Sequence, residues 1–228
     1  MSSVTATTAS SPSLAVLERF SALRILPVIV IDDPADAVPL AGALSAGGLP
    51  CAEVTLRTPR ALEALARIAG ERPDVLVGAG TVLSPAQAAE ARTAGARFVV
   101  APGFNPAVVE FCQSVDLPVF PGVCTPTEIE MALGRGLSVL KFFPAEPMGG
   151  LAFLKAIAAP YVGVSFMPTG GIGPANLASY LAFSRVASCG GSWMAPNEWI
   201  AGGQFDRIRD TTAAAVAIVA AHAAGAPS

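Results

Sequence analysis

The sequence predicts a single (β/α)8 barrel with one extra helix at its N-terminal end. Three observations support this fold class. Short β-branched runs alternate with longer Ala- and Leu-rich runs of helical pattern, the alternation occurs eight times in 228 residues, and no segment of different composition divides the chain. Strict alternation of strand and helix implies a parallel sheet, and eight such units favour its closure into a barrel.

The predicted strands are short runs rich in Val, Ile, Leu and Phe. They are expected at Ile25–Val30, Cys51–Leu56, Val75–Val77, Arg97–Val100, Leu117–Phe120, Ser138–Phe142, Val162–Met167 and Arg185–Cys189. The alternative architecture is an open, doubly wound sheet. The absence of a G-x-G-x-x-G pattern after the first strand argues against that alternative.

The predicted helices follow the strands, and several begin with a proline, which suits the first helical turn. They are expected at Pro34–Ala46, Pro59–Ala69, Pro85–Ala94, Pro106–Ser114, Pro126–Leu133, Leu151–Ala158, Ala175–Ala182 and Phe205–Ala221. A leading helix at Leu14–Leu23 should plug or flank the bottom of the barrel. The residues that precede the prolines are good N-caps, namely Asp33, Thr58, Ser84, Asn105 and Thr125.

Domain organisation and cell compartment follow from composition. Met1–Ser13 is rich in Ser, Thr and Ala and lacks the basic and apolar regions of a secretory signal, so we expect a disordered tail followed by a barrel domain over 14–228. No segment resembles a membrane span. The formal net charge of -3 argues against a nucleic-acid surface. Four scattered cysteines without a Cys-x-x-Cys pair suit free thiols in the cytoplasm.

Lys141 is the first candidate for chemistry. The chain has only two lysines, and Lys155 falls in a helical pattern, whereas Lys141 lies near the end of the sixth strand. Side chains alternate along a strand, so Val139, Lys141 and Phe143 share one face. Apolar surroundings disfavour the charged form of an amine, and the neutral form attacks carbonyl carbon. The alternative is a lysine that extends from the strand end into solvent.

The second strand carries Glu53 and Arg57 on one face, together with Cys51 and Thr55. The other face is apolar and should pack against the outer helices, so the polar set should point into the barrel. A carboxylate there can do acid–base work beside an amine, and an arginine at the strand end can bind a substrate carboxylate. The alternative is that Glu53 and Arg57 simply pair with each other.

Glycine-rich segments end three of the strands. They are Gly78–Thr81, Pro168–Pro174 and Cys189–Ser192. Glycine lets a backbone approach a ligand closely, and the loops after strands seven and eight of α/β barrels often bind phosphate. The alternatives are ordinary tight turns and, at Thr81 and Ser84, helix capping.

Several kinds of site are disfavoured. His222, in the last predicted helix, is the only histidine, so neither a histidine-based triad nor a zinc site with several histidines is expected. No P-loop sequence is present. We therefore expect chemistry without a metal or an organic cofactor.

Taken together, these segments resemble the bacterial KDPG/KHG aldolase family, where KDPG is 2-keto-3-deoxy-6-phosphogluconate and KHG is 2-keto-4-hydroxyglutarate. The resemblance extends from Phe20 to Arg207. The matching stretches are Glu53–Thr58, Val77–Val82, Pro121–Glu128, Leu140–Glu146, Pro168–Ile172 and Gly190–Trp193. They are specific in combination.

The resemblance implies a class I aldolase that cleaves KDPG into pyruvate and glyceraldehyde 3-phosphate. Lys141 would form the Schiff base, Glu53 would shuttle protons, and Arg57 and Thr81 would hold the pyruvyl carboxylate. The remaining implied substrate contacts are Phe143 in the pyruvate pocket, and Thr169, Gly170, Gly171, Gly190 and Ser192 around the distal phosphate. The family is typically a cytoplasmic homotrimer. The alternatives are an aldolase for KHG or for the galacto epimer of KDPG, and a non-catalytic barrel that binds a phosphorylated metabolite.

Overall fold

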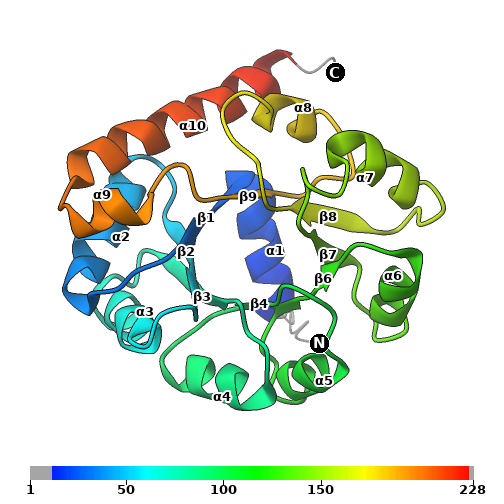
Figure 1. Cartoon of the computed structure of the whole chain (residues 1–228), viewed down its shortest axis with the longest axis horizontal. Helices are drawn as coiled ribbons and strands as arrows, with labels where there is room; N and C mark the ends of the chain where they lie inside the picture. Colours follow the sequence, from blue (N-terminus) through cyan, green and yellow to red (C-terminus); the bar gives the residue numbers. More distant parts are fainter. Residues whose placement is uncertain (1–11, 226–228) are drawn as a thin grey trace, which may run out of the picture.

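Parallel strands form a ring at the centre of the molecule, and helices surround the ring (Figure 1). The computed structural model describes residues 12–225. Its strands are β1 (Ile25–Ile29), β2 (Cys51–Thr55), β3 (Leu76–Gly80), β4 (Val99–Val100), β5 (Val119–Phe120), β6 (Gly122–Val123), β7 (Val139–Phe142), β8 (Ser165–Pro168) and β9 (Cys189–Gly191). Its helices are α1 (Pro12–Leu23), the 3-10 helix η1 (Pro34–Asp36), α2 (Ala37–Ala46), α3 (Ala61–Glu71), α4 (Pro85–Thr93), α5 (Pro106–Ser114), α6 (Pro126–Leu133), α7 (Gly150–Ala158), α8 (Leu177–Leu181), α9 (Asn197–Ala201) and α10 (Phe205–Gly225).

Backbone pairing closes the ring. One parallel sheet has the order β5-β4-β3-β2-β1-β9, and a second has the order β6-β7-β8. Pro121 alone separates β5 from β6, and its carbonyl accepts the Lys141 N–H at 2.9 Å, so these two short strands form one position in the ring. A parallel bridge between Thr169 and Gly190 joins β8 to β9. The predicted (β/α)8 barrel is therefore confirmed, and the open-sheet alternative is wrong.

Side chains alternate between the inside and the outside of the ring as the sequence pattern predicts. On β2, Cys51 lies in the cluster that fills the barrel, whereas Ala52 and Val54 pack into the layer beneath the outer helices. On β7, Leu140 and Phe142 pack outward in the same manner. Lys141 alternates with these outward residues and faces the interior.

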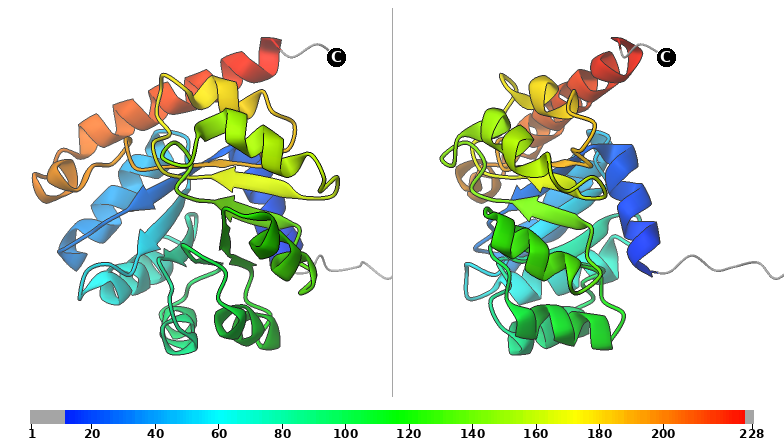
Figure 2. Two further views of the ribbon diagram at one scale, coloured as in Figure 1. Left: turned by 45° about the vertical axis from the view of Figure 1, so that its right-hand side comes forward. Right: turned by 90° about the vertical axis from the view of Figure 1, so that its right-hand side faces the viewer.

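Helix α1 covers one end of the barrel (Figure 2). Its Val16 and Phe20 belong to the interior cluster, most of whose other members lie on the inner faces of the strands, among them Leu26, Cys51 and Met167. The Phe20 and Phe98 rings pack edge to face, with 4.9 Å between the ring centroids. Because aromatic and aliphatic side chains fill this end, the polar interior positions lie towards the carboxyl ends of the strands.

Helix starts follow the capping chemistry of the sequence at four of the five predicted positions. The side chains of Asp33, Ser84, Asn105 and Thr125 each accept a hydrogen bond from a backbone N–H of the helix that follows. Thr58 is the exception, because α3 begins later, at Ala61, and the Thr58 hydroxyl donates instead to the Ile31 carbonyl at 2.6 Å. Its prediction as an N-cap is therefore wrong.

Two of the strands extend further than predicted, into glycines. The third strand was predicted to end at Val77 but continues to Gly80, and the last strand is Cys189–Gly191 rather than Arg185–Cys189. A methyl group at Gly78 would lie 2.5 Å from the Phe98 ring, so the missing side chain allows close packing inside the barrel. Glycine at these positions serves the strand interior and not only the loop.

The ends of the chain differ slightly from the prediction. Helix α1 begins at Pro12, two residues before the predicted Leu14, and α9 is a short helix that the sequence pattern did not reveal. The predicted tail otherwise lies within residues 1–11, outside the described residues, as do residues 226–228. None of the helices within 12–225 is both long and apolar enough to cross a bilayer.

Candidate active site

Lys141 and Glu53 form a buried pair inside the barrel. The Lys141 Nζ lies 3.6 Å from Oε1 of Glu53, and the two side chains are 6% and 1% exposed. The same Nζ lies over the Phe143 ring, 4.9 Å from its centroid. The lysine therefore does not extend into bulk water, and the alternative of a solvated strand-end lysine is wrong.

The Glu53 carboxylate has unused hydrogen-bonding capacity. Oε1 is buried and accepts no hydrogen bond from any residue of the described chain. Buried polar atoms are normally partnered, so an unpartnered carboxylate oxygen beside an amine is typical of a functional site. The ion pair of Glu53 is with Lys141, so the predicted alternative of a Glu53–Arg57 pair is also wrong.

Gly80 makes the space that Glu53 occupies. The β2–β3 register places Thr55 beside Gly80 and Glu53 beside Gly78. A Cβ atom at residue 80 would lie 2.3 Å from Oε1 of Glu53 and 2.6 Å from its Cγ. Any larger residue there would displace the carboxylate, so the Gly78–Thr81 segment serves the site through its lack of side-chain volume.

Arg57 is oriented by Thr55, the last residue of β2. Its Nε donates to Oγ1 of Thr55 at 3.2 Å, and the Thr55 hydroxyl donates in turn to the Ile29 carbonyl at 2.7 Å. Arg57 itself follows the end of β2, and within residues 12–225 it has no acidic partner. The Nη atoms of its guanidinium remain available for a bidentate contact with a carboxylate or phosphate.

A pocket of about 190 Å³ opens at the carboxyl ends of β8 and β9. It brings together most of the predicted substrate-binding residues, namely Arg57, Phe143, Thr169, Gly170, Gly171, Gly190 and Ser192. Gly170 and Gly171 have φ values of 101° and 84°, a left-handed backbone that bends the chain around the pocket. Such glycine turns present backbone N–H groups to an anion.

Three further residues line this pocket, and the sequence reasoning did not select them. They are Val28, Ile172 and Gly191. Val28 could have been found from the alternation on β1, which places it on the inner face two residues after Leu26. Ile172 and Gly191 carry no polar side chain. The only sequence signal for them is that each directly follows a glycine predicted to contact the substrate.

Thr81 is the one predicted substrate-binding residue that lies outside the pocket shared by the others. It follows Gly80 at the end of β3 and has a φ of 57°, which is strained for a β-branched residue. It does not line the 190 Å³ pocket. The capping alternative holds for Ser84, whose hydroxyl accepts from Gln87, and not for Thr81.

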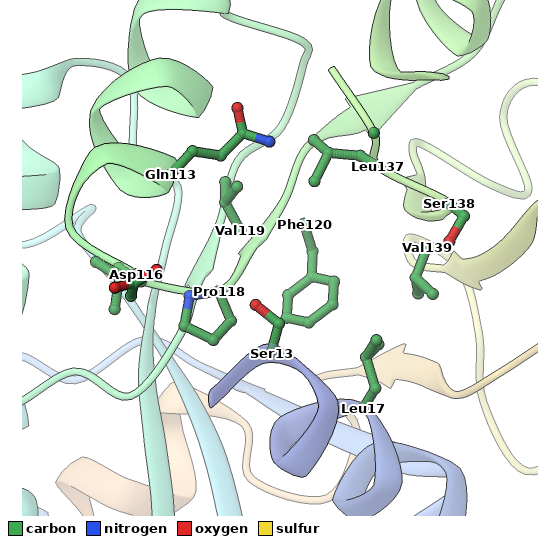
Figure 3. A pocket seen from close by; sticks show the side chains of 12 residues that line it. Ser13, Leu17, Gln113, Asp116, Pro118, Val119, Phe120, Leu137, Ser138 and Val139 are labelled. Atoms are coloured by element: carbon green, nitrogen blue, oxygen red, sulfur yellow. The ribbon is translucent and has the colours of Figure 1, made fainter. Parts of the chain in front are cut away.

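Another hollow, of about 310 Å³, lies at the opposite end of the barrel beside α1 (Figure 3). Leu17, Pro118 and Val139 are among its lining residues, and none of the predicted site residues lines it. Gln113, the amide at its edge, already donates to the Arg135 carbonyl at 2.7 Å. The chemistry-bearing groups therefore gather at the carboxyl ends of the strands alone.

Other nucleophiles and metal ligands are poorly placed. Burial raises the pKa of Cys51, Cys112 and Cys189 to about 12, which keeps these thiols protonated and unreactive at neutral pH. No group of three or more His, Cys, Asp and Glu side chains within the described part of the chain could hold a metal ion. His222 lies on α10, which packs against α2 and α8 outside the ring.

Comparison with known proteins points to one family of aldolases. The family model "KDPG and KHG aldolase" matches residues 16–211. The 2-dehydro-3-deoxy-phosphogluconate aldolase of Treponema pallidum (strain Nichols) is 52% identical over 195 residues, which cover 86% of this chain and 93% of the relative. The KHG/KDPG aldolase of Escherichia coli (strain K12) is 46% identical over 184 residues, covering 81% and 86% of the two chains.

A solved structure is similar in fold and informative in chemistry. The KDPG aldolase of Legionella pneumophila has a TM-score of 0.85 and 42% identity, with 90% of this chain and 98% of the other covered. That crystal structure holds pyruvate captured at low pH as a covalent carbinolamine intermediate. A carbinolamine forms when an amine adds to a ketone, which is the chemistry expected of a buried lysine.

Proposed function

Because the chain belongs to the KDPG and KHG aldolase family, we propose that it cleaves KDPG into pyruvate and glyceraldehyde 3-phosphate through a Schiff base on Lys141. The observation that carries the proposal is the buried pair of Lys141 Nζ and Glu53 Oε1, 3.6 Å apart, next to a pocket lined by Arg57 and glycine turns. The pair supplies a nucleophile and a proton carrier, and the pocket supplies sites for anions.

The first half of the reaction builds an electron sink. Transfer of one proton from Lys141 to Glu53 turns the ion pair into a neutral amine and a neutral acid. The amine adds to the C2 ketone, and a proton passes from the nitrogen to the oxygen to give a neutral carbinolamine. Protonation of the C2 hydroxyl by Glu53, directly or through a water, releases water and leaves a protonated imine.

The second half breaks the carbon–carbon bond. Glu53 accepts the proton of the C4 hydroxyl, the C3–C4 bond breaks, and its electron pair moves into the imine to form an enamine. The C4 fragment leaves as an aldehyde. Glu53 then returns a proton to C3, and hydrolysis of the imine releases pyruvate and the free lysine. Each proton that Glu53 accepts is thus given back within one cycle.

The proposed binding contacts follow from position. Arg57, oriented by Thr55, holds the carboxylate of the pyruvyl unit, and Thr81 adds a hydroxyl from the end of β3. Phe143 covers Lys141 and lines the pyruvate pocket. The turns that hold the distal phosphate carry Thr169, Gly170, Gly171, Gly190 and Ser192.

The test is a cleavage assay that couples pyruvate release to lactate dehydrogenase and NADH. Purified protein is compared on KDPG, its C4 epimer and KHG. The proposal expects the highest kcat/KM for KDPG. A higher kcat/KM for the C4 epimer would identify the chain as an aldolase for the galacto substrate instead.

KHG is the second candidate substrate. The observation that favours it is the E. coli relative, whose name includes both KHG and KDPG. KHG has a carboxylate where KDPG has its phosphorylated end, and an anion pocket of glycine turns can accept either group. The same assay separates the two, because comparable kcat/KM values would make the chain an enzyme of dual specificity.

The Lys141→Arg variant distinguishes an enzyme from a non-catalytic metabolite sensor. The variant keeps the positive charge but cannot form an imine. The proposal expects loss of nearly all cleavage activity. A sensor would show no cleavage in the unchanged protein and would keep its ligand affinity in the variant.

The proposal extends to assembly and compartment. A homotrimer is expected, with support from the exposed apolar Met131 and Leu133 on α6, and light scattering should then give three times the mass of the chain. A cytoplasmic location fits the four cysteines, which are all free in the structure.

A further inference from the structure

Tyr180 and Glu146 are joined behind the glycine turn that lines the pocket. Tyr180, on α8, is 1% exposed, and its hydroxyl donates to Oε1 of Glu146 at 2.5 Å. Burial, together with this hydrogen bond, raises the pKa of Tyr180 above its usual range, so the hydroxyl stays protonated and remains a donor. The mechanism uses neither residue.

Glu146 supports the turn through both backbone and side chain. Its N–H donates to the Gly170 carbonyl at 3.0 Å. A methyl group at Gly171 would lie 2.6 Å from both Cβ and Cγ of Glu146, so the side chain packs directly against the turn. Gly150 leaves room for the Glu146 carboxylate, since a Cβ added at residue 150 would lie 2.9 Å from Oε1 of Glu146. The carboxylate is therefore held between α8 and the turn.

The turn in question lines the pocket with a left-handed backbone. Gly170 and Gly171 have φ values of 101° and 84°, which glycine adopts without strain, so packing against neighbouring residues must select this shape from the others open to glycine. Glu146 contacts both glycines, and Tyr180 fixes the end of Glu146. A hydrogen bond outside the pocket is thus connected to the turn through Glu146.

We propose that Tyr180 and Glu146 are positioning residues that hold the Gly170–Gly171 turn in its phosphate-accepting shape, and so set the preference for phosphorylated over unphosphorylated substrates. This inference rests on the proposed function, because it requires that the turn receives the phosphate. The hydrogen bond also keeps the Glu146 carboxylate against Tyr180. Released, that negative charge would lie beside a site meant for a phosphate and would weaken binding of the anion.

Tyr180→Phe is the direct test, because it removes the hydroxyl and keeps the buried ring. Two substrates that differ only in the phosphate are compared, KDPG and 2-keto-3-deoxygluconate. For KDPG, KM should rise about tenfold while kcat stays within about threefold, as expected when binding common to ground and transition states is lost. For the unphosphorylated substrate, KM and kcat should both change less than about twofold.

The chain provides a matched control. Its only other tyrosine, Tyr161, also bonds a glutamate, with 3.1 Å between its hydroxyl and Oε1 of Glu130, but it lies between α7 and β8 at the opposite end of the barrel. Tyr161→Phe should leave both substrates unchanged. Glu146→Gln keeps the size and an acceptor for Tyr180, so KM for KDPG should stay near that of the unchanged protein.

The outcomes separate this inference from the proposed function. Failure of the unchanged protein to cleave KDPG or to form a pyruvate adduct contradicts the proposed function itself. With that activity present, an equal loss on both substrates, or no change in Tyr180→Phe, overturns the positioning role. If Tyr180→Phe does not fold, as judged by its thermal melt, Glu146→Ala takes its place under the same criteria. A Glu146→Gln variant with the raised KM of Tyr180→Phe also overturns it.

Discussion

Replacing Gly80 with alanine should lower kcat about 100-fold while leaving the barrel folded. The new Cβ would lie 2.3 Å from Oε1 of Glu53, 2.6 Å from its Cγ and 2.8 Å from its Cδ. Ordinary contact begins at 3.4 Å, so the carboxylate must move by about 1 Å, which is the scale of displacement that costs a catalytic group about two orders of magnitude.

The direction of the movement matters as much as its size. The Glu53 oxygen that the added Cβ would crowd is also the one nearest Lys141, so a shift of this oxygen away from residue 80 changes its 3.6 Å separation from Nζ. The crowding itself should cost about 1–3 kcal/mol of stability, which a thermal melt would register without loss of the folded state.

Steady-state cleavage of KDPG is the assay, and Gly163→Ala is the matched control. Gly163 lies between α7 and β8, and a Cβ added there would meet nothing within 4 Å. The Gly163→Ala variant should therefore be as active as the unchanged protein. A folded Gly80→Ala protein whose kcat falls less than about threefold would refute the reasoning, because it would mean that the position of Glu53 does not limit catalysis.

Three other predictions concern the same site and the core. Glu53→Gln keeps the size of the side chain but cannot exchange protons, so kcat/KM should fall by about 10²–10⁴, and a fall below tenfold would exclude Glu53 as the proton carrier. Thr55→Val removes the acceptor that orients Arg57, so KM should rise about threefold to tenfold with little change in kcat, and an unchanged KM would exclude this orienting role. Burial raises the pKa of Cys112 from 9.0 to about 12, so its contribution to stability is present below pH 9 and is lost as pH rises towards 12. Between pH 9 and 12 the free energy of unfolding should therefore fall more steeply with pH in the unchanged protein than in Cys112→Ala. The two slopes should differ by up to about 1.4 kcal/mol per pH unit, and identical slopes would contradict the burial of this thiol.

The sequence predicted the barrel well because local patterns and capping carry much of it. Helices α5 and α6 have the predicted bounds, and each begins with proline after a residue whose side chain caps the helix. The alternation on β2 and β7 placed Glu53 and Lys141 on inner faces before their partners were known. Period-two patterning predicts orientation without any knowledge of neighbouring strands.

What the sequence could not predict depends on contacts between distant segments. The role of Gly80 requires the β2–β3 register, which cannot be read from the sequence of either strand alone. The Thr58 cap was wrong because α3 begins three residues after it, at Ala61, and the Thr58 hydroxyl instead donates to the Ile31 carbonyl, 27 residues away in sequence. Tyr180 was not selected since its pattern is that of a core helix residue, and only the folded chain brings it to Glu146.

Reductive trapping with pyruvate tests the central claim most directly. Borohydride reduces a protein imine to a stable amine, and mass spectrometry after proteolysis then locates the added pyruvyl group. With only two lysines in the chain, the answer is unambiguous. The account predicts one adduct, on Lys141. An adduct on Lys155, or none in a protein that still cleaves KDPG, would contradict it.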